Sequence, residues 1–294
     1  MDVAFILELI VNGAMVGLMY ALIAIGIVLI YKSSAVVNFA QGSMVMLGGF
    51  VVWSLAERAG VPSWVSLPMG LGLMYAFGLG VERLALRPMV GQPVIMIIMM
   101  TLGLEIFLRG FTPAVWGIDP RPLDLGLGQK ALFWGRMLIN RSYLVGGLIA
   151  LAVTGLCALL FKTRTGIRLR AVSDDYVASW SVGIYVERAI GKTWGMAGAM
   201  ACVGGALWGS IQGVDWSLSL LLLKCLSVAI LGGLDSIGGA VVAGLMVGVL
   251  ESVISAIVDP MVGSSREVVA VFVILLTILV RPHGLFGKEI IERV

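Results

Sequence analysis

Histidine and cysteine are scarce in this chain. Among 294 residues there is one histidine, His283, and there are three cysteines. Cys157, Cys202 and Cys225 all fall inside apolar segments, where cysteine is ordinarily a small buried side chain. We therefore expect no metal site, no haem and no disulfide framework. Paired carboxylates and Cys/His constellations are also missing, so we expect no catalytic residues.

Charge is scarce as well. Charged residues make up 13% of the chain and hydrophobic residues 60%, with a mean hydropathy of +1.04. Soluble domains carry roughly a quarter charged residues, so these values exclude an ordinary soluble domain and indicate an integral membrane protein. The net charge of +3 comes from scattered basic residues, which gives no sign of a nucleic-acid partner. The N-terminus lacks a basic region, so we expect no cleavable signal peptide.

Glycine, by contrast, is abundant. The chain has 39 glycines, about twice the number that an average usage of ~7% would give. The pairs Gly13/Gly17, Gly205/Gly209 and Gly244/Gly248 have the Gly-x-x-x-Gly spacing that lets membrane helices approach closely. We expect these pairs to pack helices within the chain, with a role in dimerisation as the alternative.

Hydropathy predicts an all-α, polytopic transmembrane helical bundle in one domain, residues 1–294. A membrane span needs about 20 apolar residues. The candidate segments are Phe5–Tyr31, Phe39–Leu55, Val65–Val81, Val94–Leu108, Tyr143–Phe161, Thr193–Ile211, Leu218–Leu234, Ile237–Val258 and Val268–Val280. The second, seventh and ninth are short or interrupted by glycine, which is typical of broken or re-entrant segments. We therefore expect eight or nine spans.

A charged insert separates two of these segments. Residues 162–192 carry nine charged residues, six of them basic, so the insert must lie in water, and the positive-inside rule places it in the cytoplasm. Ser173 followed by Asp174 and Asp175 predicts the N-cap of a short helix. This helix is either a contact for a partner or part of a solvated loop that only sets topology.

The insert orients the remaining loops. With nine spans the N-terminus is outside, and the tail, residues 281–294, is cytoplasmic; with eight spans the N-terminus is inside. In the nine-span arrangement twelve basic residues face inward and six outward, as the positive-inside rule requires. Residues 111–141 then form a periplasmic loop, which Pro113, Pro120 and Pro122 keep from being one continuous helix.

Polar residues at membrane depth are costly and need partners. Glu105 and Arg109 have the i, i+4 spacing of a local ion pair. Lys224 stands near one end of its segment, where we expect it to snorkel. For mid-membrane Glu251, and for Glu8 with Asn12, the sequence favours structural contacts over gating or transport roles.

Five short motifs follow one another along the chain. They are Val37-Asn-Phe-Ala-Gln-Gly, Arg87-Pro-Met, Gly166-Ile-Arg-Leu-Arg-Ala-Val-Ser-Asp-Asp, Gly232-Gly-Leu-Asp-Ser-Ile-Gly-Gly and Arg281-Pro-His-Gly-Leu-Phe-Gly. The ordered set resembles the permease subunits of branched-chain amino-acid ABC importers, a family that also includes importers of urea and short amides. Two positions depart from the family pattern: Gln41 replaces a histidine, and Gly238 replaces a common proline.

The resemblance implies a multi-pass subunit of the bacterial inner membrane that binds no cofactor itself. Its implied partners are a second related permease, two cytoplasmic ATPases that hold ATP and Mg, a periplasmic substrate-binding protein and membrane lipid. The sequence agrees, because the nearest approach to a phosphate loop, Gly191-Lys-Thr, has Val186 where the first glycine must stand. The rival class is a free-standing secondary transporter or channel, for which Glu251 is the only central acidic candidate.

The resemblance also implies site residues and a cargo. The ATPase-coupling residues are Ser173, Asp174, Asp175, Ala178, Gly183 and Ile184. The pathway residues are Asn38, Gln41, Ser43 and Met44, although Asn38 could instead be a helix cap. The expected cargo is a branched-chain or other aliphatic amino acid, with urea, short amides or aromatic acids as alternatives.

Overall fold

The computed structural model describes residues 3–89, 92–126, 132–134, 137–174, 176–263, 265–281 and 283–287. The helices are α1 (Val3–Ser34), α2 (Gln41–Trp53), α3 (Ser63–Val81), α4 (Val94–Trp116), α5 (Arg141–Lys162), α6 (Arg164–Asp174), α7 (Tyr176–Ser181), α8 (Val186–Gln212), α9 (Leu221–Gly232), α10 (Ile237–Val262) and α11 (Arg266–Val280), with short turns η1 (Ser54–Arg58), η2 (Glu82–Leu86), η3 (Arg87–Met89) and η4 (Trp216–Leu220). Strands β1 (Leu132–Trp134) and β2 (Met137–Ile139) form an antiparallel hairpin. The predicted all-α class is confirmed.

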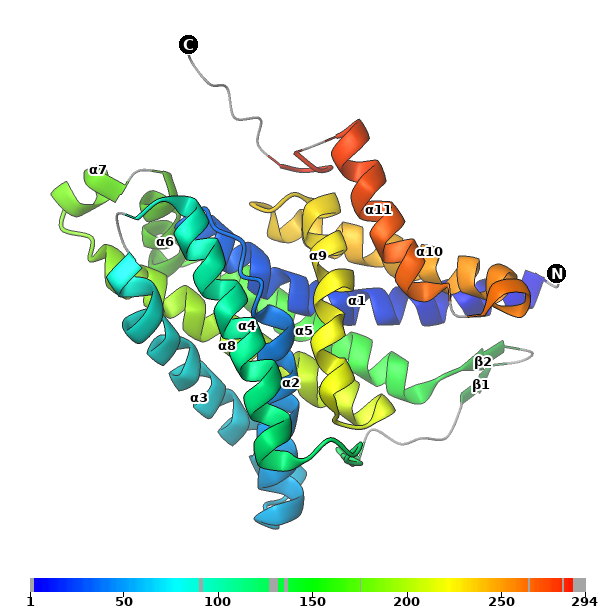
Figure 1. Cartoon of the computed structure of the whole chain (residues 1–294). Coiled ribbons are helices and arrows are strands. Elements are labelled where there is room, and N and C mark those ends of the chain that lie inside the picture. The colour runs from blue at the N-terminus through cyan, green and yellow to red at the C-terminus, as the bar shows by residue number, and fades with distance from the viewer. Residues whose placement is uncertain are drawn as a thin grey trace.

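Helix α1 runs through the centre of the bundle, where α5, α8, α9 and α10 pack around it (Figure 1). Its sequence is apolar on every side, which is the pattern of a buried helix rather than an amphipathic one. Over its most apolar stretch 83% of the residues are buried. This helix is therefore the core on which the other elements are placed.

Glycine brings α1 and α10 into backbone contact. A Cβ atom added to Gly13 would lie 2.7 Å from the carbonyl oxygen of Gly248, and one added to Gly244 would lie 2.6 Å from that of Gly17. Neither position has room for a side chain. On the other side of the bundle, Gly205 of α8 packs against the backbone of α2. The prediction that these glycines pack helices within the chain is confirmed.

The structure identifies some of the predicted membrane spans. Among the described residues five helices are long and apolar enough to cross a membrane, namely Ala4–Ser34, Ser63–Met89, Val94–Trp116, Arg141–Lys162 and Ile237–Pro260. Helix α2 has 13 residues, a length of ~20 Å, and α9 is similarly short. The count of eight or nine spans therefore stays a prediction.

Opposite ends of α1 carry different structures. Helices α6 and α7 lie at its C-terminal end, and the β1–β2 hairpin lies at its N-terminal end (Figure 1). The Oε2 atom of Glu8 accepts a hydrogen bond from the amide of Leu138 at 3.0 Å. The side chain of Asn12 donates to the carbonyl of Leu138 and accepts from the amide of Asn140, both at 3.1 Å. The predicted structural role of Glu8 and Asn12 is confirmed, and it is to hold this hairpin.

The predicted loop of residues 111–141 begins inside a helix. Helix α4 continues through Pro113 and ends at Trp116, so the connection before the hairpin starts at Gly117 instead of residue 111. The Nε1 atom of Trp116 donates to the Ser54 hydroxyl at 2.5 Å, and its ring lies 5.7 Å from that of Phe50. These contacts with α2 and η1 hold the last turn of α4 beyond its proline.

Candidate functional site

Four predicted pathway residues meet at the start of α2. Asn38, Gln41, Ser43 and Met44 are all completely buried, and we refer to them as the α2 polar cluster. The Oδ1 atom of Asn38 accepts a hydrogen bond from the amide of Ala40 at 3.0 Å, and its Nδ2 atom donates to Oε1 of Gln41 at 3.2 Å. Asn38 thus forms an Asx-type turn before the helix. It is not the helix cap, since Ala40 occupies that position.

Gln41 joins α2 to α8 and to α1. Its Nε2 atom donates to the carbonyl oxygen of Ala197 on α8 at 3.2 Å. On the α1 side, a Cβ atom added to Gly26 would lie 3.0 Å from Cδ of Gln41. The amide therefore occupies space that a glycine leaves open, and both of its ends are hydrogen-bonded, as burial of a polar group requires.

Helix α4 closes the cluster from the remaining side. The Ser43 hydroxyl donates to the carbonyl oxygen of Glu105 at 3.3 Å. The amide of Phe39 donates to the Thr101 hydroxyl at 3.4 Å. Glu105 also pairs with Arg109 at 3.4 Å, which confirms the predicted i, i+4 ion pair. The α2 polar cluster is thus the junction of α1, α2, α4 and α8.

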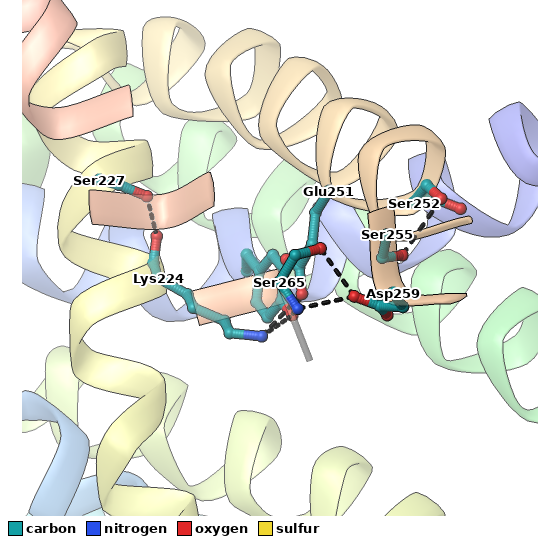
Figure 2. A network of polar contacts seen from close by, with 8 residues as sticks. Lys224, Ser227, Glu251, Ser252, Ser255, Asp259 and Ser265 are labelled. Carbon is teal, nitrogen blue, oxygen red and sulfur yellow. Dashed lines mark hydrogen bonds and ion pairs between the residues drawn. The ribbon is translucent and has the colours of Figure 1, made fainter. Parts of the chain in front are cut away.

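A second polar cluster lies inside the bundle, and Figure 2 shows Lys224 reaching from α9 toward Glu251 on α10. The Lys224 Nζ atom is 2.7 Å from Oε1 of Glu251. The Tyr20 hydroxyl on α1 donates to the same oxygen at 3.3 Å and lies 3.4 Å from Nζ. The prediction that Lys224 snorkels to an interface is wrong, because a buried carboxylate holds its ammonium. Glu251 thus makes the helix–helix contact that the sequence favoured.

This cluster links four helices. The Tyr20 ring stacks on Trp208 of α8, with centroids 5.3 Å apart and planes inclined by 11°. Sequence reasoning considered Lys224 and Glu251 separately and missed their pairing. The available signal was that opposite charges in two apolar segments each need a partner in a low-dielectric interior.

The predicted coupling residues lie at the end of the bundle formed by α6 and α7. Ser173 belongs to the last turn of α6, which continues to Asp174, so its predicted role as an N-cap is wrong. The expected short helix is α7, which begins at Tyr176. Asp175 lies outside the described residues. The Ser-Asp-Asp pattern predicted a helix start at Ser173, but this serine lies in the last turn of α6, and α7 begins only at Tyr176.

Helix α7 ends in a defined turn. Gly183 has φ +81°, and its amide donates to the carbonyl of Trp180 at 3.0 Å. The amide of Ile184 donates to the carbonyl of Ser179, also at 3.0 Å. This is a Schellman motif, in which the left-handed position favours glycine. The predicted residues Gly183 and Ile184 therefore form the turn that leaves α7.

Large apolar side chains are exposed around this turn. Trp180 is 74% exposed, Val182 80% and Tyr185 67%, and we call these three residues the α7 patch. Ala178 is also exposed. Close to the patch in sequence, Glu187 pairs at 3.1 Å with Arg87 of the Arg87-Pro-Met motif. Clustered exposed apolar residues beside charged ones are typical of an interaction surface.

An apolar helical bundle with internal polar junctions and a charged connection at one end is the architecture of a polytopic membrane protein. The chain belongs to the family described as "Branched-chain amino acid transport system / permease component", which matches residues 9–281. Membership in this family makes it a transport permease rather than an enzyme.

Individual relatives align over nearly the whole chain. The high-affinity branched-chain amino acid transport system permease protein LivH of Salmonella typhimurium is 29% identical over 99% of this chain and 98% of its own. BraD of Pseudomonas aeruginosa is 28% identical over 98% of both chains. A probable LivH of Methanocaldococcus jannaschii is 29% identical over 96% and 93%. Among solved structures, PsaBC of Streptococcus pneumoniae in complex with Fab has a TM-score of 0.46 at 13% identity, covering 94% and 91% of the two chains.

Proposed function

We propose that this chain is the permease subunit of an ATP-driven importer and forms the pathway for a small solute with a polar head group. The observation that carries this proposal is the family match over residues 9–281, with relatives named for branched-chain amino acid transport. A branched-chain or other aliphatic amino acid is the first substrate that we propose. Urea, short amides and aromatic acids are alternatives within the same class.

The proposed assembly lies in the bacterial inner membrane. It contains a second related permease, two cytoplasmic ATPases that bind ATP and Mg, and a periplasmic binding protein. The lack of a phosphate loop in the sequence supports an external source of energy. We assign ATPase docking to Ser173, Asp174, Asp175, Ala178, Gly183 and Ile184, and the exposed α7 patch beside them supports this assignment.

In this proposal the α2 polar cluster is the closed section of the pathway. Its four residues are completely buried, so a solute would pass only when α2 moves relative to α8. Hydrogen bonds from Gln41 to the α8 backbone and from Ser43 to the α4 backbone are the contacts that such a movement would break. Weak individual hydrogen bonds suit this role, because each contributes only about 1 kcal/mol net.

The test is reconstitution of the chain in proteoliposomes with the ATPase, permease and binding-protein products of neighbouring genes. We expect uptake of labelled leucine that requires both ATP and the binding protein, with labelled urea and phenylalanine as comparison substrates. The chain purified alone should hydrolyse no ATP. Leucine uptake that follows an ion gradient and ignores ATP would overturn the proposal in favour of a secondary transporter.

A further inference from the structure

A pocket of about 160 Å³ opens between the end of α8, the η4–α9 segment and the start of α11. This volume is below the ~300–1,000 Å³ of pockets that hold drug-sized ligands, so it suits a small solute. The pocket belongs to the end of the bundle opposite α6 and α7, because α8 starts beside α7 and ends at Gln212. If α6 and α7 are cytoplasmic, as proposed above, the pocket faces the side from which solute arrives.

One wall of the pocket carries a fixed positive charge. Lys224 lines the pocket, and its side chain is 16% exposed. Its ammonium has three N–H donors, and the described partners Glu251 and Tyr20 account for two of them. Figure 2 shows how the buried carboxylate holds this ammonium in place. The ammonium therefore has the capacity to donate to one further acceptor.

An acidic residue lines the same pocket. Glu267 stands in the first turn of α11, where it is exposed. The turn before α11 is fixed, because the Asp259 Oδ1 atom accepts hydrogen bonds from the amide and hydroxyl of Ser265 at 2.6 and 2.7 Å. The backbone at the start of α11, which carries Glu267, is therefore tied to α10 through Ser265.

Apolar side chains complete the lining. Leu220, Leu223 and Ala270 line the pocket together with the charged residues. A cation, an anion and an aliphatic surface are the three features that recognise a free aliphatic amino acid, which presents a carboxylate, an ammonium and a hydrocarbon side chain. Charged groups in a partly enclosed site interact more strongly than in open water.

We propose that this pocket binds an aliphatic amino acid before it enters the pathway. The solute carboxylate accepts a hydrogen bond from the Lys224 ammonium, its own ammonium donates to Glu267, and its side chain packs against Leu220 and Leu223. The proposal rests on the proposed function for the direction of transport, and it adds a solute site separate from the α2 polar cluster. A zwitterionic lipid headgroup carries the same two charges, so the test must separate the two sources.

The test uses saturation-transfer difference NMR on the purified full-length chain in detergent, with leucine as the probe. We expect saturation transfer to the leucine methyl groups. Glu267→Gln should weaken leucine binding about fivefold, as expected for loss of one partly exposed ion pair. Glu57→Gln is the matched control, because Glu57 is an exposed acid outside this pocket, and it should bind leucine like the wild type.

Two analogues test the recognition of both charges. 4-Methylpentanoate lacks the ammonium and isoamylamine lacks the carboxylate, so each should bind more weakly than leucine to the wild type. 4-Methylpentanoate should bind the Glu267→Gln variant as tightly as it binds the wild type, because it has no ammonium to pair with Glu267. Equal binding of leucine by the Glu267→Gln and Glu57→Gln variants would overturn the proposal. Binding of soluble short-chain phosphatidylethanolamine without any binding of leucine would also overturn it and would identify a lipid headgroup site.

This experiment is independent of transport, since it needs neither ATPases nor a binding protein. If the reconstituted wild-type complex imports none of leucine, urea and phenylalanine in an ATP-dependent way while the isolated chain binds leucine at this pocket, the proposed function fails and the pocket stands. If the complex imports leucine and the Glu267→Gln complex does so at the same rate over all leucine concentrations, the pocket fails and the proposed function stands.

Discussion

The ammonium of Lys224 on α9 lies 2.7 Å from a carboxylate oxygen of Glu251 on α10, within the helical bundle. Both side chains are largely removed from solvent, with 16% and 6% exposed. At such a site the attraction between the charges is strong, but so is the cost of leaving either charge alone. The pair therefore fixes α9 against α10, and the Tyr20 hydroxyl extends the link to α1.

Lys224→Met should be strongly destabilising. It leaves the Glu251 carboxylate buried without its cation, a change that costs about 3–5 kcal/mol in buried pairs. Adding Glu251→Met should recover much of that loss, since the unpaired charge is removed. Unfolding of the purified chain in detergent, followed by tryptophan fluorescence, gives the free energies for a double-mutant cycle.

Glu105→Gln is the matched control for this cycle. It breaks the more exposed Glu105–Arg109 pair within α4, so it should cost no more than about 0.5 kcal/mol. Equal losses in Lys224→Met and Glu105→Gln would show that the inner pair contributes no more than a surface pair. A double variant as unstable as Lys224→Met alone would show that the loss is one of packing instead.

Gly244→Ala should weaken the contact between α1 and α10. The new methyl group would lie 2.6 Å from the carbonyl oxygen of Gly17, so the two backbones must separate. Gly155→Ala on α5 is the control, because outside its own stretch of helix no atom lies within 4 Å of its added Cβ. There the helix preference for alanine should stabilise the chain by up to ~1 kcal/mol. Thermal unfolding monitored by size-exclusion chromatography should move in opposite directions for the two variants.

Composition and hydropathy predicted most of the fold. Each candidate span became a helix, because a run of apolar residues in lipid has to satisfy its backbone groups internally. The Gly-x-x-x-Gly spacing predicted close helix packing within the chain, since it places small residues along one face of a helix, but it did not predict that α1 would pack on α10. These features depend on local patterns within single segments.

The contacts that the sequence did not predict involve partners that are distant in sequence. The hairpin is held by Glu8 and Asn12, whose hydrogen-bond partners follow more than a hundred residues later. Lys224 looked like a snorkelling residue because its partner Glu251 stands on another helix. At Ser173 a local rule failed for a different reason. A Ser-Asp-Asp sequence is typical of a helix start, but here Ser173 and Asp174 end α6, and α7 follows from Tyr176.

The proposed orientation predicts which side of the membrane each loop faces. Val182 is 80% exposed and Ile118 is 72% exposed, at opposite ends of the bundle. A cysteine introduced at Val182 should react only from the cytoplasm, and one at Ile118 only from the periplasm. Labelling with a membrane-impermeant maleimide, on intact cells and on inverted vesicles, measures this directly. The native cysteines are buried, so the background should be low. Reaction of Ile118→Cys only in inverted vesicles would reverse the orientation.

The α7 patch should carry ATPase docking. Trp180→Ser removes the largest exposed apolar side chain of the patch, so co-purification of the ATPases should fall while the permease stays folded. The same should follow from Asp174→Arg combined with Asp175→Arg, which reverses the charge of two proposed docking residues; a charge change at a helix end alters stability by only about 1 kcal/mol. Trp64→Ser is the matched control, because Trp64 is 78% exposed at the start of α3. Equal retention of ATPase by the Trp180 and Trp64 variants would argue that α6 and α7 form only a solvated connection.

Gln41→Leu should lower transport without changing the affinity of the binding protein for its cargo. The substitution is close in size but removes the hydrogen bonds to Ala197 and Asn38, and each buried group left unpaired costs about 1–3 kcal/mol. Gln41→Glu is the comparison: in its ionised form it keeps the shape and an acceptor for Asn38, but it loses the donor to Ala197 and adds a buried charge. If the hydrogen bond from Gln41 to Ala197 of α8 controls opening of the pathway, the uptake rates of both variants should differ from the wild-type rate at equal expression. Uptake at the wild-type rate in Gln41→Leu proteoliposomes would remove Gln41 from the pathway and leave the segment before α2 as helix packing alone.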